Sequence, residues 1–257
     1  MSQIHSTAII DKTAVLGDDI TIGPNAIIEH DAIIGNNVII GANCLVAAYA
    51  ELRDRVTLFH GAVLGTVPQD LKFKGERTKL VIGEGTTIRE YAMLSRGTAY
   101  SGQTVIGKNC LLMAYSHVAH DCIIGDNVIL ANSVNLAGHV EIGDYVIIGG
   151  VVPVHQFVKI GAHAMIGGGY RVPQDICPYS LVAGYPLKVI GLNAIGLKRR
   201  GFKSETIRLI EQAFKFLFFS NLNTTQAVEK IKSEIEPIAE IKTILLFIGN
   251  SNRGMVK

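Results

Sequence analysis

Aliphatic residues recur along this chain at every sixth position. Stepping by six from Ile4 to Val172 gives 29 positions, of which 26 hold Ile, Leu or Val. The three exceptions are Asp70, Glu76 and Tyr100. A period of six fits neither an α-helix nor a plainly alternating strand. It predicts short strands joined by turns, with one large aliphatic side chain of each repeat pointing inward.

A second column of small or β-branched residues lies four positions after the aliphatic one. Its members include Ala26, Ala32, Val38, Cys44, Ala50, Val56, Ala62, Cys110, Ser116, Cys122 and Val128. Three such repeats would close one coil of about 18 residues, and each coil would bury its apolar side against its neighbours. Adjacent coils would stack at the usual strand spacing of about 4.8 Å. The pattern predicts a parallel β-helix over residues 1–190, and the spacing does not determine its handedness.

Two stretches leave the repeat without shifting its phase, residues 66–79 and residues 96–104. Long excursions from a regular scaffold are often functional loops. Alternatively, the two stretches are surface insertions without a function.

The C-terminal part of the chain, residues 191–257, changes to a helical pattern. Ser204 is a candidate N-cap, a second helix would start at Thr224 or Thr225, and Pro237 can open a third. The aliphatic and aromatic residues of these helices recur at helical spacing, which predicts that one face of each helix packs into a core. An open β-helix end exposes unpaired backbone groups, so a helical domain that covers it is expected.

Composition indicates a protein with one large core and no membrane span. Hydrophobic residues make up 48% of the chain and charged residues 18%, but no apolar run reaches the roughly 18 residues that a span requires. The N-terminus lacks the pattern of a secretory signal. The four cysteines show no close pairing, which is typical of free thiols in a reducing compartment. We therefore expect a cytoplasmic protein.

Charge is unevenly distributed along the chain. From Gly191 to the end there are 11 Lys and Arg against 6 Glu, a balance of +5, which leaves −3 for residues 1–190 given the total of +2. A basic C-terminal segment favours an acidic partner or a phosphate ligand there.

Four of the eight histidines fall between residues 117 and 155. They are His117, His120, His139 and His155. On a coil of about 18 residues, His120 lies under Gly138 and Gln156, and Asp121 lies under His139. His120 follows the inward Val118 by two positions and should point outward. The imidazoles and the carboxylate would therefore gather along one external ridge.

Three interpretations of this ridge are open. Each histidine could be an ordinary surface residue. His117, His120 and Asp121 have a spacing that resembles a metal site, although residues three apart on a β-helix project in different directions. Alternatively, His120 could take a proton from a hydroxyl group while Asp121 orients the imidazole and the Gly138 N–H binds an oxyanion. We favour this acid–base interpretation.

Several motifs together resemble the UDP-N-acetylglucosamine O-acyltransferases of lipid A biosynthesis, over essentially the whole chain. They are PQDLKF (68–73), IRE (88–90), LM (112–113), HVAHDC (117–122), LAGHV (136–140), VHQF (154–157) and GLKRRGF (196–202). Hexapeptide repeats alone would indicate only an acyltransferase-like β-helix, whereas this set of motifs is highly specific.

The resemblance implies a left-handed β-helix and a homotrimer with active sites between subunits, with no metal or other cofactor. The implied reaction moves an (R)-3-hydroxyacyl chain from acyl carrier protein to the 3-position of UDP-N-acetylglucosamine or its 3-amino analogue. The implied partners are acyl carrier protein and the UDP-amino sugar, with no nucleic acid.

The resemblance also implies roles for individual residues. His120 would be the general base, Asp121 would orient it, and the Gly138 N–H would stabilise the oxyanion. The implied substrate-binding residues are Gln69, Asp70, Lys72, His117, His139, His155, Gln156, Asn193, Arg199 and Arg200. Gly168 matches a position that limits acyl length, and a glycine there favours a longer chain.

Two residues depart from the family pattern. Ser95 stands where many relatives have histidine, and Ile195 stands where some have glutamate after the asparagine. They leave open whether the acceptor carries a 3-hydroxyl or a 3-amino group. A zinc-dependent, carbonic-anhydrase-like β-helix enzyme is the rival from another class. A later N-acyltransferase of the same pathway and a non-catalytic scaffold are less favoured, the former because the repeat already begins at Ile4.

Overall fold

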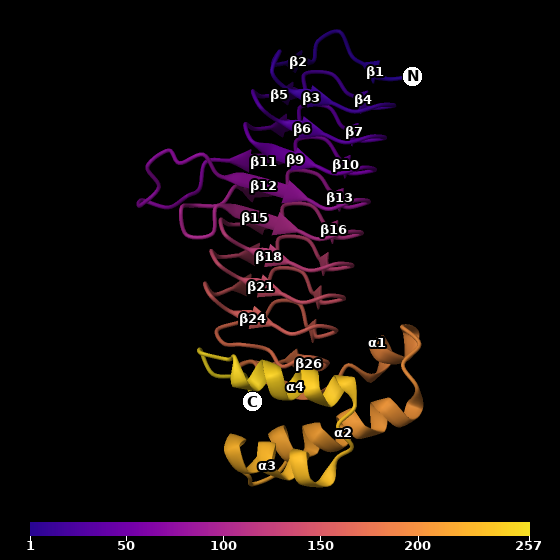
Figure 1. The fold of residues 1–257 in the computed structure, drawn as a ribbon, viewed down its shortest axis with the longest axis vertical. Helices are drawn as coiled ribbons and strands as arrows, with labels where there is room; N and C mark the ends of the chain where they lie inside the picture. Colours follow the sequence, from indigo (N-terminus) through magenta and orange to yellow (C-terminus); the bar gives the residue numbers. More distant parts are fainter.

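The computed structural model describes residues 1–257 and shows a tall prism of stacked coils with helices at its C-terminal end (Figure 1). The predicted left-handed parallel β-helix with C-terminal helices is confirmed. Each coil contributes one short strand to each of three sheets. Ile4 pairs with Ile22, eighteen residues further on, as the three-repeat coil predicts.

The three sheets, here named A, B and C, form the three sides of the prism. Sheet A contains β1 (Gln3–Ile4), β4 (Thr21–Ile22), β7 (Ile39–Ile40), β10 (Thr57–Leu58), β13 (Thr87–Ile88), β16 (Leu111–Leu112), β19 (Ile129–Leu130), β22 (Ile147–Ile148), β25 (Met165–Ile166), β26 (Ser180–Ala183) and β27 (Lys188–Leu192). Sheet B contains β2 (Ile9–Ile10), β5 (Ile27–Ile28), β8 (Leu45–Val46), β11 (Val63–Thr66), β14 (Met93–Ser95), β17 (His117–Val118), β20 (Asn135–Leu136) and β23 (Pro153–Val154). Sheet C contains β3 (Val15–Leu16), β6 (Ile33–Ile34), β9 (Ala50–Leu52), β12 (Lys79–Ile82), β15 (Gln103–Ile106), β18 (Ile123–Ile124), β21 (Glu141–Ile142) and β24 (Lys159–Ile160).

Two-residue strands place one side chain inside the prism and one outside. In β7, Ile40 is 1% exposed and Ile39 is 47% exposed. Because the strands pair in register, Ile40 stacks between Ile22 and Leu58 of the adjacent coils. The aliphatic column of the sequence is therefore a continuous apolar core.

The two predicted excursions are loops that leave the same edge of the prism. The long loop (67–78) joins β11 to β12, and the short loop (96–102) joins β14 to β15. Both connections run from sheet B to sheet C, and we call the line along which these sheets meet the B–C edge. The long loop projects from the coils next to β11 and β12 (Figure 1).

The C-terminal end of the β-helix is covered by a hairpin and four helices. Strands β26 and β27 pair antiparallel and extend sheet A. The helices are α1 (Ala194–Arg199), α2 (Ser204–Phe218), α3 (Thr224–Glu234) and α4 (Ala239–Gly249). The division predicted after residue 190 falls inside β27, and the separation into two domains stays a prediction.

The helix starts differ slightly from the sequence predictions. Helix α2 begins at Ser204, so Lys203 and not Ser204 is its N-cap, without a side-chain cap hydrogen bond. Helix α3 begins at Thr224 as predicted, because Asn223 and Gln226 form a capping box. Helix α4 begins two residues after Pro237, with Ile238 at the N-cap. None of the four helices has both the length and the apolar character that crossing a bilayer requires.

Truncation of an inward residue should destabilise the protein far more than truncation of its outward neighbour. We expect Ile40→Ala to lower the free energy of unfolding by roughly 2–5 kcal/mol, because it opens a cavity between coils. The matched control Ile39→Ala should change it by less than about 0.5 kcal/mol. Urea or thermal denaturation measures both, and equal losses would contradict the assigned orientation of the strand.

Candidate active site

The candidate site lies on the B–C edge, in the turns that follow β17, β20 and β23. These turns hold His120 and Asp121, then Gly138 and His139, then Gln156 and Phe157. Backbone hydrogen bonds link them, from the His139 N–H to the His120 carbonyl at 3.0 Å and from the Phe157 N–H to the Gly138 carbonyl at 3.1 Å. The side chains therefore stack in the columns that the coil length predicts.

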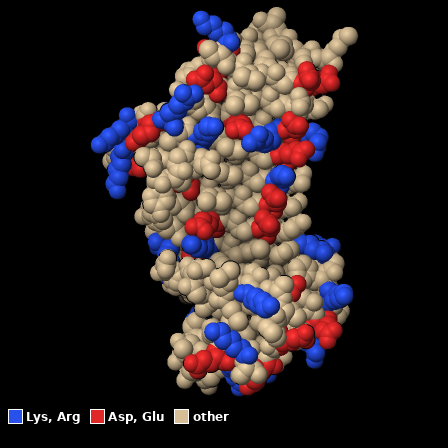
Figure 2. All heavy atoms as spheres, viewed as in Figure 1, with Lys and Arg blue, Asp and Glu red and all other residues tan.

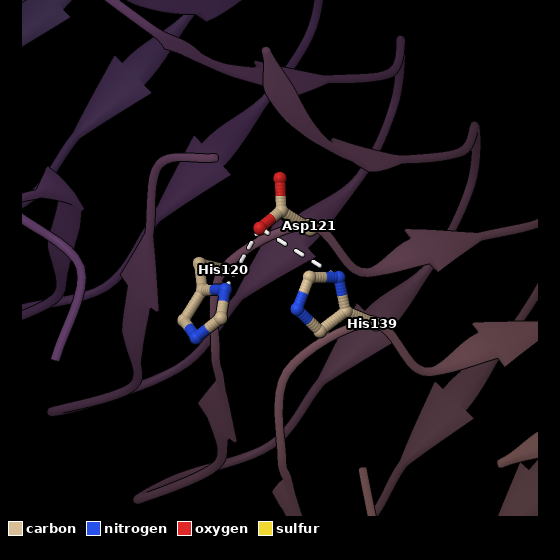
Figure 3. Close-up of side chains that lie close together, drawn as sticks. All are labelled: His120, Asp121 and His139. Carbon is tan, nitrogen blue, oxygen red and sulfur yellow. Dashed lines mark hydrogen bonds and ion pairs between the residues drawn. The ribbon is translucent and has the colours of Figure 1, made fainter. Parts of the chain in front are cut away.

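His120 and Asp121 form a close pair. His120 Nδ1 lies 2.8 Å from Asp121 Oδ2, and His139 Nδ1 lies 3.8 Å from the same oxygen (Figure 3). The Asp121 side chain is fully buried, whereas 13% of the His120 side chain is exposed. The imidazole thus faces the solvent side with a buried carboxylate behind it.

The short loop supplies most of the hydrogen bonds to Asp121. The Thr98 hydroxyl donates to Oδ2 at 2.6 Å and the Thr98 N–H donates to Oδ1 at 3.0 Å, while the Ser101 hydroxyl donates to Oδ1. Burial alone would raise the pKa of Asp121, but the hydrogen bonds from Ser101, Thr98 and His120 outweigh it and lower the pKa to about 2. Asp121 is therefore ionised at neutral pH.

An ionised Asp121 determines the tautomer of His120. A carboxylate can only accept hydrogen bonds, so the proton of a neutral His120 lies on Nδ1 and points to Asp121 Oδ2. The lone pair then lies on Nε2, away from the carboxylate. This arrangement suits a general base, because the acceptor nitrogen faces outward and the imidazolium that forms would be stabilised by Asp121.

Gly138 lies directly against the His120 ring. A Cβ atom on Gly138 would come within 2.7 Å of His120 Cε1, so only glycine fits without moving the imidazole. The Gly138 N–H donates no hydrogen bond to any other group of the chain. A backbone N–H beside the candidate base is thus available for an external acceptor.

The unpaired N–H of Gly138 contrasts with the edge where sheets C and A meet. There a carboxylate from the next coil accepts from the equivalent N–H, as Asp144 Oδ1 does from Asp126 at 2.8 Å and Asp126 Oδ1 does from Lys108 at 2.7 Å. The B–C edge carries no such carboxylate next to Gly138. The turns of the two edges therefore have the same backbone shape, but at Gly138 the turn N–H is left without an acceptor, whereas at Asp126 and Lys108 it is paired.

His139 sits in an aromatic pocket beside the pair. Its ring stacks on Phe157, with centroids 4.3 Å apart, and contacts the edge of Tyr100 at 4.5 Å. Burial lowers the pKa of His139 below its ordinary value, although the charges of Asp121 and Asp70 oppose this effect. His139 is therefore predominantly neutral at pH 7.

The remaining predicted residues of this edge lie close by. His117 is an outward residue of β17, and burial lowers the pKa of its imidazole. His155 Nδ1 lies 3.2 Å from the carbonyl oxygen of Gln156, whose side chain is exposed. These residues border the pair without touching Asp121.

The long loop brings the predicted Gln69, Asp70 and Lys72 to the same edge. Gln69 Nε2 lies 3.7 Å from the sulfur of Met93 in sheet B, and Asp70 Oδ1 accepts from the Lys72 N–H at 2.9 Å. Met93 pairs with His117 of β17, so the start of the long loop contacts sheet B next to the strand that leads to His120.

His117, His120 and Asp121, whose spacing in the sequence resembles a zinc site, do not come together as three metal ligands. The side chains that approach one another are His120, Asp121 and His139, within 4.8 Å, and His117 is not among them. Both oxygens of Asp121 already accept hydrogen bonds from the short loop. A metal ion would have to displace these donors, so the donor set fits an acid–base pair better.

The other predicted residues lie on a different side of the prism. A cavity of about 720 Å³ on sheet A, beneath α1, is lined by Asn193, Arg199 and Arg200 together with Ile147, Met165, Leu181, Leu192, Ala194, Ile195 and Gly196. The Asn193 side chain is buried and caps α1, accepting from the Gly196 N–H at 3.2 Å and donating to the His163 carbonyl at 2.9 Å. Arg200 donates to the Tyr145 carbonyl at 2.8 Å, and Arg199 is exposed.

One chain therefore does not assemble all the predicted residues into one site. The pair lies on the B–C edge, and the cavity with its arginines lies on sheet A. Gly168 is exposed in a turn that follows sheet A, next to Gly150 of the preceding coil. Of the two departures from the family pattern, Ser95 is fully buried and Ile195 is 68% exposed in the cavity wall.

The sequence prediction missed the residues that hold Asp121 and His139. Thr98 and Ser101 donate hydrogen bonds to the carboxylate of Asp121, and Thr104 Oγ1 accepts one from the Asp121 N–H at 2.9 Å. Tyr100 and Phe157 pack on His139. The only sequence signal for the loop residues was that residues 96–104 leave the repeat.

Fold and site together define a hexapeptide-repeat transferase. Residues 13–54 and 103–138 match the family model described as bacterial transferase hexapeptide (six repeats). Residues 175–256 match the model described as Udp N-acetylglucosamine O-acyltransferase, domain 2.

Relatives that match over the full length of the chain identify the family more narrowly. The acyl-[acyl-carrier-protein]–UDP-N-acetylglucosamine O-acyltransferase of Chlorobaculum parvum is 57% identical over 99% of this chain and 97% of its own, and that of Aquifex aeolicus is 54% identical over 99% and 98%. The crystal structure of the UDP-N-acetylglucosamine acyltransferase from Bacteroides fragilis has a TM-score of 0.98 at 41% identity, covering 99% of this chain and 100% of that one. The chain belongs to the acyl-[acyl-carrier-protein]–UDP-N-acetylglucosamine O-acyltransferase family. The resemblance inferred from the motifs is confirmed, and the rival zinc enzyme is not supported.

The lowered pKa of Asp121 predicts a pH-dependent contribution to stability. The group has an ordinary pKa of 3.8 and a folded-state pKa of about 2, so its stabilisation is complete above 3.8 and is lost as the pH falls through about 2. We expect Asp121→Asn to lower Tm most at pH 5–7, and the difference from wild type should shrink toward pH 2. Calorimetry across this range measures it, and a difference that does not depend on pH would contradict the assignment.

Proposed function

We propose that this protein transfers an (R)-3-hydroxyacyl group from acyl carrier protein to the 3-position of UDP-N-acetylglucosamine, or of its 3-amino analogue, as the first step of lipid A biosynthesis. The names of the full-length relatives support the reaction class. The observation that carries the proposal is the outward-facing His120, hydrogen-bonded at 2.8 Å to a buried, ionised Asp121. The cytoplasmic location expected from the sequence stays a prediction.

In the proposed mechanism His120 Nε2 removes the proton from the 3-hydroxyl (or 3-amino) group of the sugar. The sugar oxygen or nitrogen attacks the thioester carbonyl, whose oxygen becomes an oxyanion that accepts from the Gly138 N–H. The tetrahedral intermediate collapses, the carbon–sulfur bond breaks, and the thiolate of the carrier takes the proton back from His120. Asp121 stays ionised throughout and stabilises the imidazolium. Each of these steps uses only groups of the chain and the two substrates.

The neighbouring residues of the B–C edge would bind the substrates. Asp70 and Lys72 of the long loop can bond sugar hydroxyls and phosphate, with Gln69 beside them. Neutral His139 and His117 can donate or accept hydrogen bonds without adding charge to the site. His155 and Gln156 would extend this surface by one coil.

We propose a homotrimer in which the active site lies between subunits. The B–C edge with His120 and the sheet A cavity with Asn193, Arg199 and Arg200 lie on different sides of one chain. A sugar nucleotide could contact both if the cavity of one subunit faced the B–C edge of the next. Arg199 would then bind the diphosphate, for which its planar guanidinium is suited. Asn193 would contribute mainly by holding α1 in place, because its side chain already bonds the Gly196 N–H and the His163 carbonyl.

The basic C-terminal segment is the proposed docking region for acyl carrier protein. Its charge balance of +5 is complementary to an acidic partner. On the face shown in Figure 2, basic and acidic side chains mix over the helices, and a group of basic side chains covers the projecting long loop. Gly168 leaves its turn open, which favours a longer acyl chain.

Removal of the base should abolish activity without unfolding the protein. We expect His120→Ala to lower kcat by at least about a hundredfold, because general-base catalysis typically contributes that much or more. Transfer of a radiolabelled or mass-tagged acyl group from the carrier to UDP-N-acetylglucosamine measures it, with Tm and molecular mass as checks on folding. The 3-amino analogue and a panel of chain lengths in the same assay identify the preferred substrates.

The chain offers a matched control for this variant. His30 occupies the same turn position four coils earlier on the B–C edge and lies 3.4 Å from Asp31, but both side chains are exposed. His30→Ala should retain nearly full activity. Comparable turnover by His120→Ala, or an equal loss in both variants, would rule out His120 as the base.

Mixing two inactive variants tests the proposed site between subunits. If His120 of one subunit works with Arg199 of the next, random co-assembly of His120→Ala with Arg199→Ala restores roughly a quarter of wild-type activity. Co-assembly of His120→Ala with Asp121→Asn should restore almost none, because both residues belong to the same edge. Activity is measured after joint refolding or co-expression, and no recovery in the first mixture would contradict a shared site.

A further inference from the structure

The short loop connects the long loop to the body of the β-helix. The Arg96 N–H donates to the Thr66 carbonyl at 3.1 Å, and the Gly97 N–H donates to the Lys79 carbonyl at 3.1 Å. The Thr78 hydroxyl donates to the Gly97 carbonyl at 2.6 Å. Two consecutive residues of the short loop thus bond both ends of the long loop.

The Arg96 side chain is a buried cation without a carboxylate partner. It is 9% exposed and forms none of the ion pairs of the chain. Its guanidinium carbon lies 5.5 Å from the ring centroids of both Tyr49 and Phe73, and Nη1 is 3.4 Å from the Ala48 carbonyl oxygen. Burying an unpaired charge is costly, and two aromatic faces offset part of that cost.

These contacts join the tip of the long loop to the coils. Tyr49 belongs to a turn of the β-helix, whereas Phe73 lies in the middle of the long loop. The Phe73 N–H donates to the Asp70 carbonyl at 3.0 Å, and the Lys72 N–H donates to the Asp70 side chain. The position of Phe73 therefore determines where Asp70 and Lys72 lie.

The other cationic contact of the long loop is weaker. Arg77 lies over the Tyr49 ring at 4.8 Å and pairs with Asp31 at 3.6 Å, but Arg77 is 73% exposed and the pair is screened by solvent. The buried Arg96 is therefore the main side-chain anchor of the loop tip.

We propose that Arg96 is a positioning residue, whose guanidinium between Tyr49 and Phe73 holds the tip of the long loop, and with it Asp70 and Lys72, against the coils. The substrate-binding part of this inference rests on the proposed function. The anchoring of the loop stands independently of it. Arg96 does not touch Asp121, so it acts on substrate binding and not on the base.

The variant Arg96→Met, which keeps the aliphatic bulk but removes the charge, tests the inference. We expect trypsin to cleave the long loop after Lys72, Lys74 and Arg77 about tenfold faster than in wild type. The KM for UDP-N-acetylglucosamine should rise about tenfold, with kcat changed less than about threefold and the pH profile of kcat unchanged. Arg96→Lys should recover part of both effects, because an ammonium group retains some cation–π attraction.

Two further variants make the result decisive. Arg53→Met removes an exposed arginine that pairs with Glu51 on sheet C, and should change neither cleavage nor KM. Phe73→Leu removes the same cation–π contact by changing its partner in the long loop, and it should reproduce the effects of Arg96→Met. If Arg96→Met does not fold, Phe73→Leu serves as the test in its place. The effects of the two substitutions should be less than additive when combined, since they remove one interaction.

Unchanged cleavage and unchanged KM in both Arg96→Met and Phe73→Leu would overturn the inference. A fall in kcat with a shifted pH profile and an unchanged KM would also overturn it, because Arg96 would then act on the His120–Asp121 pair. If wild-type protein does not acylate the sugar nucleotide, the proposed function fails, and the cleavage rates still decide whether Arg96 anchors the loop.

Discussion

The stacking of one aliphatic side chain per hexapeptide on its counterpart in the next coil is the interaction on which this structure depends. Ile22, Ile40 and Leu58 form one such column, fully removed from water. A shift of one residue would expose every inward side chain, so the eighteen-residue register is strongly determined. The same register aligns the outward residues, which is why His120 lies beneath Gly138 although neither contributes to the core.

The B–C edge becomes a site because loops cover part of it. The dipeptide His-Asp occurs twice at the same turn position, at residues 30–31 and 120–121. The first pair is solvent-exposed and 3.4 Å apart, whereas the second is 2.8 Å apart with a buried carboxylate. The difference comes from the short loop, whose hydroxyl and N–H donors keep Asp121 ionised despite burial. The same loop also binds the long loop, so the carboxylate and the candidate substrate-binding residues share one support.

The chain divides its candidate binding groups between two sides of the prism. Local structure explains part of this division, because Asn193 must cap α1 and Arg200 must bond the Tyr145 carbonyl to hold the helix against the coils. Arg199, on the same helix, stays exposed at the rim of an apolar cavity. A rigid β-helix cannot bend these groups toward His120, so the proposed shared site requires a second copy of the chain.

The sequence by itself determined the repeat, the coil length, the outward direction of His120 and the two loops, because a strict period of six leaves only one way to bury the aliphatic residues. It also placed the start of α3 and the columns that contain Gly138 and His139. Only the tertiary structure decided that Thr98 and Ser101 bond Asp121, that Asn193 is a helix cap and that Ser95 is buried. These contacts join residues from irregular loops to distant coils, and no periodic pattern encodes the path of a loop or the partner of a side chain within it.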